Sequence, residues 1–168
     1  MKFIIIVLLF FTNLYALENR QALMKAIQQH AIRLGDGPDK VYAFIDPLCS
    51  QSQRYLELLF SREDLQEKNS YYIFLDALEQ FDSHDLIAHI YQSDDPLTTL
   101  HDVIVYKDYD TDIYESTQKS ALIISQIHKV VKQLNIKRRP YLILYNESSH
   151  ECKVAEGTAP CMEAEKSK

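Results

Sequence analysis

The stretch that decides the fold of this chain is Ala43-Phe44-Ile45-Asp46-Pro47-Leu48-Cys49-Ser50-Gln51-Ser52. An apolar run from Val41 to Ile45 predicts a strand that ends at a proline turn. Cys49 follows at the point where an amphipathic helix is expected to begin. Unpaired backbone N–H groups and the helix dipole at such a position favour the thiolate, which is the reactive form of cysteine. This context therefore predicts thiol chemistry at Cys49.

The position where a redox pair would carry its second sulfur is occupied by Ser52, so the chain holds half of a C-x-x-C motif. A serine oxygen cannot release a substrate from a mixed disulfide as a second thiolate does. The activities that remain are isomerisation or reduction in which another thiol resolves the adduct, or the covalent holding of a partner. The alternative is that Cys49 is a relic in a binding protein, because a buried free cysteine commonly behaves as a small hydrophobe.

The pattern on either side of this stretch predicts an α/β fold. Helices are expected over residues 19–34, 50–60 and 120–134, and strands over 41–46, 71–75, 141–145 and 150–154. The order strand, helix, strand around Cys49 predicts a parallel βαβ unit, and the short connection between the last two strands predicts an antiparallel hairpin. Residues 82–118 are polar and look like an insertion packed beside the sheet.

The first sixteen residues are typical of an export signal, with Lys2, the apolar run from Phe3 to Phe11 and the small Ala16 at the expected cut. The protein is therefore expected to be periplasmic or otherwise exported. An uncleaved membrane anchor is the alternative, because Leu14 is not the small residue expected near a cleavage site. The expected division is a signal peptide (1–16), an N-terminal helix and linker (17–38), the α/β domain (39–157, with the insertion at about 82–118) and a polar tail (158–168).

Three segments in this order resemble the DsbC/DsbG disulfide isomerases. They are Phe44-Ile45-Asp46-Pro47-Leu48-Cys49, then Ile90-Tyr91-Gln92-Ser93-Asp94-Asp95-Pro96 with Leu100-His101-Asp102, and Gln133-Leu134-Asn135-Ile136 with Pro140. The resemblance implies a thioredoxin-like fold with a helical insertion, and a cis peptide bond at Pro140 that faces Cys49. The chain departs from that family at Ser52, at Gln92 near an expected cysteine, and at Arg139, where the family has a small threonine.

Cys49, Ser52 and Pro140 are accordingly the expected catalytic positions, and Arg139 and Pro140 the expected substrate contacts. Asp46 would shape the turn, and Pro140 would present a backbone edge to an extended peptide. A guanidinium beside Cys49 would favour the thiolate by Coulomb attraction. The alternative is that Arg138 and Arg139 merely face solvent at the start of a strand.

Cys152 and Cys161 are expected to form a disulfide, because two nearby cysteines of an exported protein usually pair. The bridge would tie the tail to the sheet. The alternative is that Cys161 reaches Cys49 as a distant resolving thiol.

The expected partners are exported proteins that contain cysteines, a redox partner, or an envelope assembly. Nucleic acid is not expected, because the formal net charge is −6. No cofactor or metal is expected. Asp108-Tyr109-Asp110-Thr111-Asp112 begins like a calcium loop, but Ile113 and Lys119 stand where such a loop needs glycine and glutamate.

Overall fold

The computed structural model describes residues 20–107, 109, 116–146 and 151–156. A sheet of five strands runs in the order β1-β3-β2-β4-β5. The strands are β1 (Ile32–Leu34), β2 (Asp39–Ile45), β3 (Asn69–Leu75), β4 (Tyr141–Asn146) and β5 (Glu151–Glu156). The helices are α2 (Ser50–Ser61), α3 (Glu63–Lys68), α4 (His84–Gln92), α5 (Pro96–His101) and α6 (Gln118–Gln133). Residues 20–27 are also helical, and two short turns, η1 (Gln28–His30) and η2 (Asp102–Tyr106), complete the described part.

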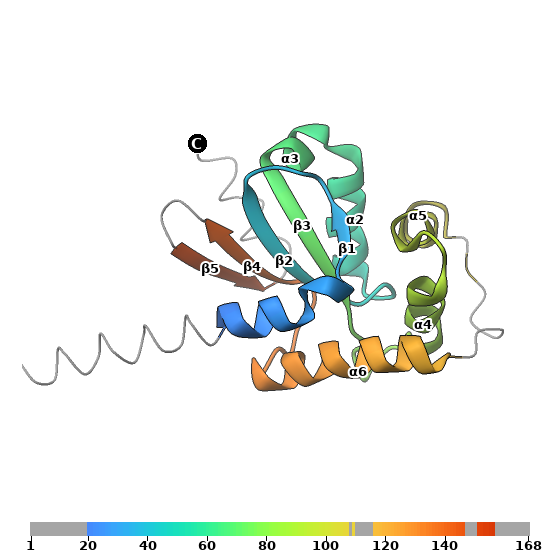
Figure 1. Ribbon diagram of the computed structural model, residues 1–168. Coiled ribbons are helices and arrows are strands. Elements are labelled where there is room, and N and C mark those ends of the chain that lie inside the picture. Colours follow the sequence, from blue (N-terminus) through green and yellow to red (C-terminus); the bar gives the residue numbers. More distant parts are fainter. Residues whose placement is uncertain (1–19, 108, 110–115, 147–150, 157–168) are drawn as a thin grey trace, which may run out of the picture.

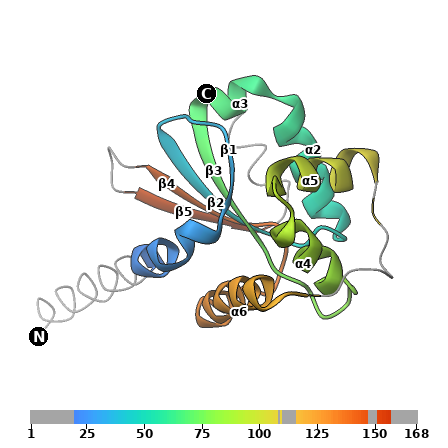
Figure 2. The ribbon, with the colours of Figure 1, turned by 45° about the vertical axis from the view of Figure 1, so that its right-hand side comes forward.

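The βαβ unit around Cys49 is confirmed. Strands β2 and β3 pair in parallel, with Val41 opposite Tyr71 and Ile45 opposite Leu75, and α2 with α3 connects them. Both strands are continuous apolar runs because they lie in the middle of the sheet and are buried on both faces. Figures 1 and 2 show α2 and α3 on one face of the sheet, and α6 with the helix at residues 20–27 on the other.

The expected C-terminal hairpin is also confirmed, since β4 and β5 pair antiparallel and β4 joins the sheet beside β2. The insertion between β3 and α6 is helical: α4 packs against α6 and α5, and η2 contacts α2. The helix α6 starts at a capping box in which Thr117 and Ser120 satisfy each other's backbone N–H groups.

The helix expected over residues 19–34 is wrong in its last part. The helix ends at residue 27, and Ile32–Leu34 form the edge strand β1, which pairs antiparallel with β3. The apolar spacing of Ile27, Ala31 and Leu34 fits a helical period, but Ile32 and Leu34 face the core as alternate residues of a strand. Pairing with β3 satisfies backbone groups that would otherwise be left open at the sheet edge, and this tertiary gain overrides the local pattern.

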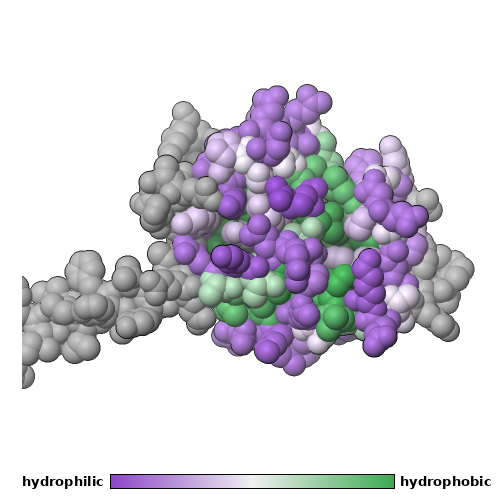
Figure 3. Space-filling model, in the orientation of Figure 1, coloured by the Kyte–Doolittle hydropathy of each residue, from purple (hydrophilic) through white to green (hydrophobic). Residues whose placement is uncertain are grey.

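Hydrophilic residues cover most of the face seen in Figure 3, and hydrophobic residues show between them. Among the residues that the structure describes, none of the helices has the length and apolar content needed to cross a membrane.

The loop from β1 to β2 passes over the start of β3 and comes very close to its backbone. Gly35 has φ +74°, and a Cβ atom there would lie 2.5 Å from the carbonyl oxygen of Asn69. A Cβ atom at Gly37 would lie 2.0 Å from the carbonyl carbon of Lys68. Since both obstacles are backbone, glycine is what allows the chain to cross here.

We expect Gly37→Ala to lower the free energy of unfolding by about 2 kcal/mol or more, because the added methyl group cannot be placed without moving β3. The neighbouring Asp36→Ala is the control: Asp36 is exposed, so its effect should stay within about 0.5 kcal/mol. Urea unfolding measures both. Equal effects of the two substitutions would contradict the steric argument.

Candidate functional site

Cys49 lies at the N-terminus of α2, directly after the turn that ends β2. Its backbone N–H donates to the carbonyl oxygen of Asp46 at 3.1 Å, and its carbonyl oxygen accepts the first helical hydrogen bond from Gln53 at 2.9 Å. Cys49 is the N-cap residue, and its side chain makes no capping hydrogen bond. Only 8% of Cys49 is exposed. The thiol therefore has the helix-terminal position that the sequence predicts, in a largely buried setting.

The cis-proline segment lies against this thiol. The peptide bond between Arg139 and Pro140 is cis, as the resemblance implies. The Cys49 thiol donates to the carbonyl oxygen of Arg139, with Sγ and oxygen 3.7 Å apart. The fold thus brings together two predicted site positions, Cys49 and Pro140, that lie far apart in the sequence.

Ser52 lies one turn further along α2 and is fully buried. Its Oγ accepts a hydrogen bond from the backbone N–H of Asp46 at 3.4 Å. The hydroxyl at the position of the missing sulfur therefore contacts the backbone of the turn before Cys49, where it supports the turn and supplies no second thiol.

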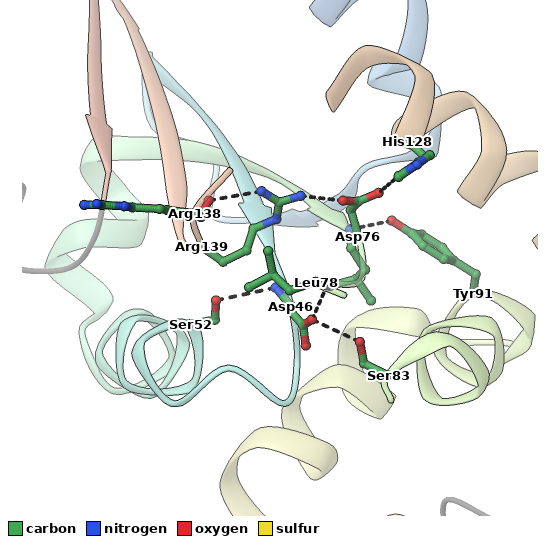
Figure 4. Close-up of polar contacts among 10 residues, drawn as sticks. Asp46, Ser52, Asp76, Leu78, Ser83, Tyr91, His128, Arg138 and Arg139 are labelled. Carbon is green, nitrogen blue, oxygen red and sulfur yellow. Dashed lines mark hydrogen bonds and ion pairs between the residues drawn. The ribbon is translucent and has the colours of Figure 1, made fainter. Parts of the chain in front are cut away.

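Asp46 holds the turn through both carboxylate oxygens, and Figure 4 shows the contacts that one of them makes with Leu78 and Ser83. Oδ1 accepts from the backbone N–H of Leu48 at 2.9 Å, and Oδ2 accepts from the N–H of Leu78 at 2.7 Å and from the hydroxyl of Ser83 at 3.0 Å. Asp46 is fully buried, so these bonds replace the water that its carboxylate loses. They also tie the Cys49 turn to the start of the helical insertion, a link that sequence reasoning missed.

The side chain of Arg139 does not face solvent, and that alternative is wrong for this residue. The guanidinium is 1% exposed and forms an ion pair with Asp76, which directly follows β3. Its Nη1 donates to the carbonyl oxygen of Arg138 at 3.0 Å. Figure 4 shows the side chains of Arg138 and Arg139 pointing in opposite directions. The contact that Arg139 makes with Cys49 comes from its backbone carbonyl, while Asp76 balances its charge.

Asp76 is the centre of a polar cluster that sequence reasoning missed. The carboxylate oxygen of Asp76 that does not contact Arg139 lies 2.9 Å from Nδ1 of His128 on α6. The backbone N–H of Asp76 donates to the carbonyl oxygen of Ile45 at 2.9 Å. The preceding N–H, of Leu75, donates to the hydroxyl of Tyr91 at 2.9 Å. Burial raises the pKa of Tyr91, so the phenol stays neutral and provides an acceptor at the end of β3.

A sequence signal for Asp76 did exist. Asp76 is the polar residue immediately after a buried strand, and that strand runs parallel to the strand before Cys49. The carboxyl ends of neighbouring parallel strands lie at the same edge of the sheet. The pairing of Asp76 with Arg139 had no such local signal.

The described part of the chain does not test the predictions for the other two site residues, Cys152 and Cys161. The backbone of Cys152 lies in β5 opposite Tyr145, and Cys161 falls outside the described residues. The disulfide between Cys152 and Cys161 therefore stays a prediction. In the ranges that the structure describes, no three histidine, cysteine or carboxylate side chains gather as metal ligands would.

Comparison of the sequence with protein-family models and with curated proteins finds no match. Solved structures do match. A periplasmic thioredoxin-like protein from Salmonella enterica serovar Typhimurium aligns with a TM-score of 0.64 and 16% identity, over 84% of this chain and 92% of the other. Helicobacter pylori DsbG aligns with a TM-score of 0.60 and 19% identity, over 80% of this chain and 66% of the other. A disulfide interchange protein from Neisseria gonorrhoeae aligns with a TM-score of 0.59 and 19% identity, over 83% of this chain and 93% of the other.

These likenesses show that the chain has the thioredoxin-like fold, with a helical insertion between the βαβ half and the C-terminal hairpin. The fold class expected from the sequence is confirmed. At such low identity the likeness concerns the fold alone, so the chemistry has to be argued from this chain's own residues.

We expect Asp76→Asn to lower the free energy of unfolding by about 3 kcal/mol or more, because it leaves the buried Arg139 charge without a counterion at almost unchanged volume. His128→Gln is the control, since 46% of the His128 side chain is exposed and its pair with Asp76 should contribute about 1 kcal/mol at most. Thermal and urea unfolding report both.

The double variant Asp76→Leu/Arg139→Met should recover much of the loss, because it removes both buried charges. Equal stability of Asp76→Asn and His128→Gln would contradict the central role of the ion pair.

Proposed function

We propose that this protein performs thiol–disulfide exchange through the single thiol of Cys49. The observation that supports this best is the position of Sγ, at the start of α2 and 3.7 Å from the carbonyl oxygen that precedes cis-Pro140. The neighbouring carbonyl belongs to a backbone segment that an extended peptide could follow. A cysteine that served only to fill the core would not need this combination.

The proposed first step is attack of the Cys49 thiolate on one sulfur of a substrate disulfide. A sulfur–sulfur bond forms between Cys49 and the substrate, the substrate's own disulfide breaks, and its second sulfur leaves as a thiolate. In the thiol form, Cys49 donates to the carbonyl oxygen of Arg139, and this bond places the sulfur beside the cis-proline segment. The bond is lost when the thiol gives up its proton for the attack.

Release of the substrate requires a thiol from outside this site, because Ser52 stands in the position of the second cysteine. If another cysteine of the substrate attacks the mixed disulfide, the substrate leaves with a rearranged disulfide and Cys49 returns as a thiolate. If a small external thiol attacks the substrate sulfur, repeated exchange reduces the substrate and oxidises that thiol. In both cases Cys49 ends unchanged.

The proposed setting is the periplasm or another exported location, and the proposed type is DsbC/DsbG-like. The apolar residues 1–16 support export, and the motif around Cys49 supports the type. Among the similar structures, one is described as periplasmic and another as a DsbG. The proposed substrates are exported proteins that contain cysteines.

A second candidate is a non-catalytic interaction or chaperone module of an envelope, secretion or conjugation system. Two observations favour it: Cys49 is only 8% exposed, and the nearby guanidinium is committed to Asp76. Under this alternative the fold is retained for binding, and Cys49 fills a space behind Pro140.

We expect glutathione disulfide to form a mixed disulfide at Cys49 of the folded protein, and Cys49→Ser to abolish it. Mass spectrometry with peptide mapping distinguishes Cys49 from Cys152 and Cys161. Ser52→Ala is the matched control, because it should leave Cys49 reactive. Modification that appears only after unfolding, together with an unchanged phenotype of Cys49→Ser in the host, would favour the binding module over exchange chemistry.

We expect Ser52→Cys to create a dithiol that forms an internal disulfide and reduces insulin, which the wild-type protein should largely fail to do. The physical reason is that the helix start, the sheet and the contact of Cys49 with the Arg139 carbonyl are all in place, so the second sulfur is the missing part. Turbidity of insulin measures the activity, with Ser52→Ala as control. A variant that neither closes its disulfide nor reduces insulin would contradict exchange-competent geometry.

A further inference from the structure

A cavity of about 720 Å³ lies between the helix at residues 20–27 and the sheet. Its walls come from that helix and from β1, β2 and β4. Figures 1 and 2 both show this helix beside the sheet, on the face that α6 also covers. The cavity lies toward the start of β2, whereas Cys49 follows the end of that strand. It is therefore a site separate from the proposed thiol site.

The floor of the cavity is a row of side chains on one face of the sheet. Arg33, Tyr42 and Ile143 line the cavity, and the strand register places them in one row with Tyr72, which supports the floor without lining it. The rings of Tyr42 and Tyr72 stack at 5.1 Å, and the Arg33 guanidinium lies 4.1 Å from the centre of the Tyr72 ring. The floor is aromatic and apolar in the middle and carries a cation at one end.

The helical wall is held in place by contacts with the core, with β2 and with α6. Met24 and Ile27 are each 2% exposed and belong to the core. The Tyr42 hydroxyl donates to Gln28 at 3.4 Å, and His30 lies 2.6 Å from the side-chain oxygen of Gln126 on α6. Because these contacts fix the helix, the cavity is preformed, as small-molecule sites usually are.

The charge of the cavity is opposite to that of the chain. Three cationic residues that line it come from the helix and from β1: Arg20, Lys25 and Arg33. No aspartate or glutamate is among the described residues that line it. The whole chain has a formal net charge of −6. Three cations around one cavity of an acidic protein favour an anionic ligand by Coulomb attraction.

We propose that this cavity binds a small organic anion with a planar aromatic body, such as an aromatic carboxylate, sulfonate or phosphate. The anionic group contacts the cations of the rim, and the ring packs on the apolar floor formed by Tyr42 and Ile143, with Tyr145 at its side. The volume is in the range of small-molecule sites and too small for a folded partner. Both halves of the ligand are needed, because neither the cations nor the floor alone would hold it firmly.

Titration of the purified protein with naphthalenesulfonate, followed by calorimetry and by backbone amide NMR, tests this proposal. We expect saturable binding, amide shifts centred on Tyr42 and Ile143, and weaker binding as salt is raised. Methanesulfonate, which has the charge without the ring, and naphthol, which has the ring without the charge, should each bind about tenfold more weakly or worse. Equal binding of either control, or shifts centred away from the cavity, would overturn the proposal.

Two pairs of substitutions separate the cavity from general charge. Arg20→Gln/Lys25→Gln removes two rim cations and should raise the dissociation constant for naphthalenesulfonate about tenfold. Lys129→Gln/Lys132→Gln removes the same charge from exposed positions of α6 and should change the dissociation constant less than about twofold. All four residues lie outside the core, so both variants should fold. Equal weakening by the two pairs would overturn the proposal.

Discussion

The buried ion pair between Asp76 and Arg139 is the interaction on which the candidate site depends. Asp76 directly follows β3, contacts His128 on α6, and binds the residue that precedes Pro140. Three parts of the fold therefore meet at one carboxylate. The guanidinium of Arg139 pairs with Asp76, while the backbone carbonyl of the same residue faces Cys49. A buried pair of this kind contributes little net stability, but removing one partner leaves an uncompensated charge, so the pair specifies the arrangement more than it stabilises it.

A second buried carboxylate, Asp46, does for the Cys49 turn what Asp76 does for the cis-proline segment. It satisfies the turn through Leu48 and reaches across to Leu78 and Ser83 at the start of the insertion. Both carboxylates follow the ends of parallel strands, where backbone N–H groups emerge without sheet partners. The insertion is consequently joined to the thiol site by hydrogen bonds, and the site residues are positioned by neighbours on rigid elements.

The chemistry available to this arrangement is narrower than that of a dithiol protein. Cys49 has the helix start and the contact with the Arg139 carbonyl, but Ser52 is buried against the turn, and the guanidinium of Arg139 pairs with Asp76. Exchange through one thiol, with release by an outside thiol, is what these contacts support. The cationic cavity at the other end of β2 adds a binding capacity with different requirements, since it depends on an aromatic floor and on rim charges instead of on sulfur.

Much of the fold was determined by local sequence: the βαβ unit, the helix after Cys49 and the hairpin after Pro140 follow from period, length and punctuation, which act over a few residues. The helical insertion was expected from the family resemblance. What only the tertiary structure decided is long-range. Ile32–Leu34 became an edge strand because β3 offered open backbone groups, against their helical spacing. Arg139 turned inward because Asp76, distant in sequence, offered a buried counterion. Such choices depend on which partners the fold brings together, and the spacing of residues along the chain does not contain that information.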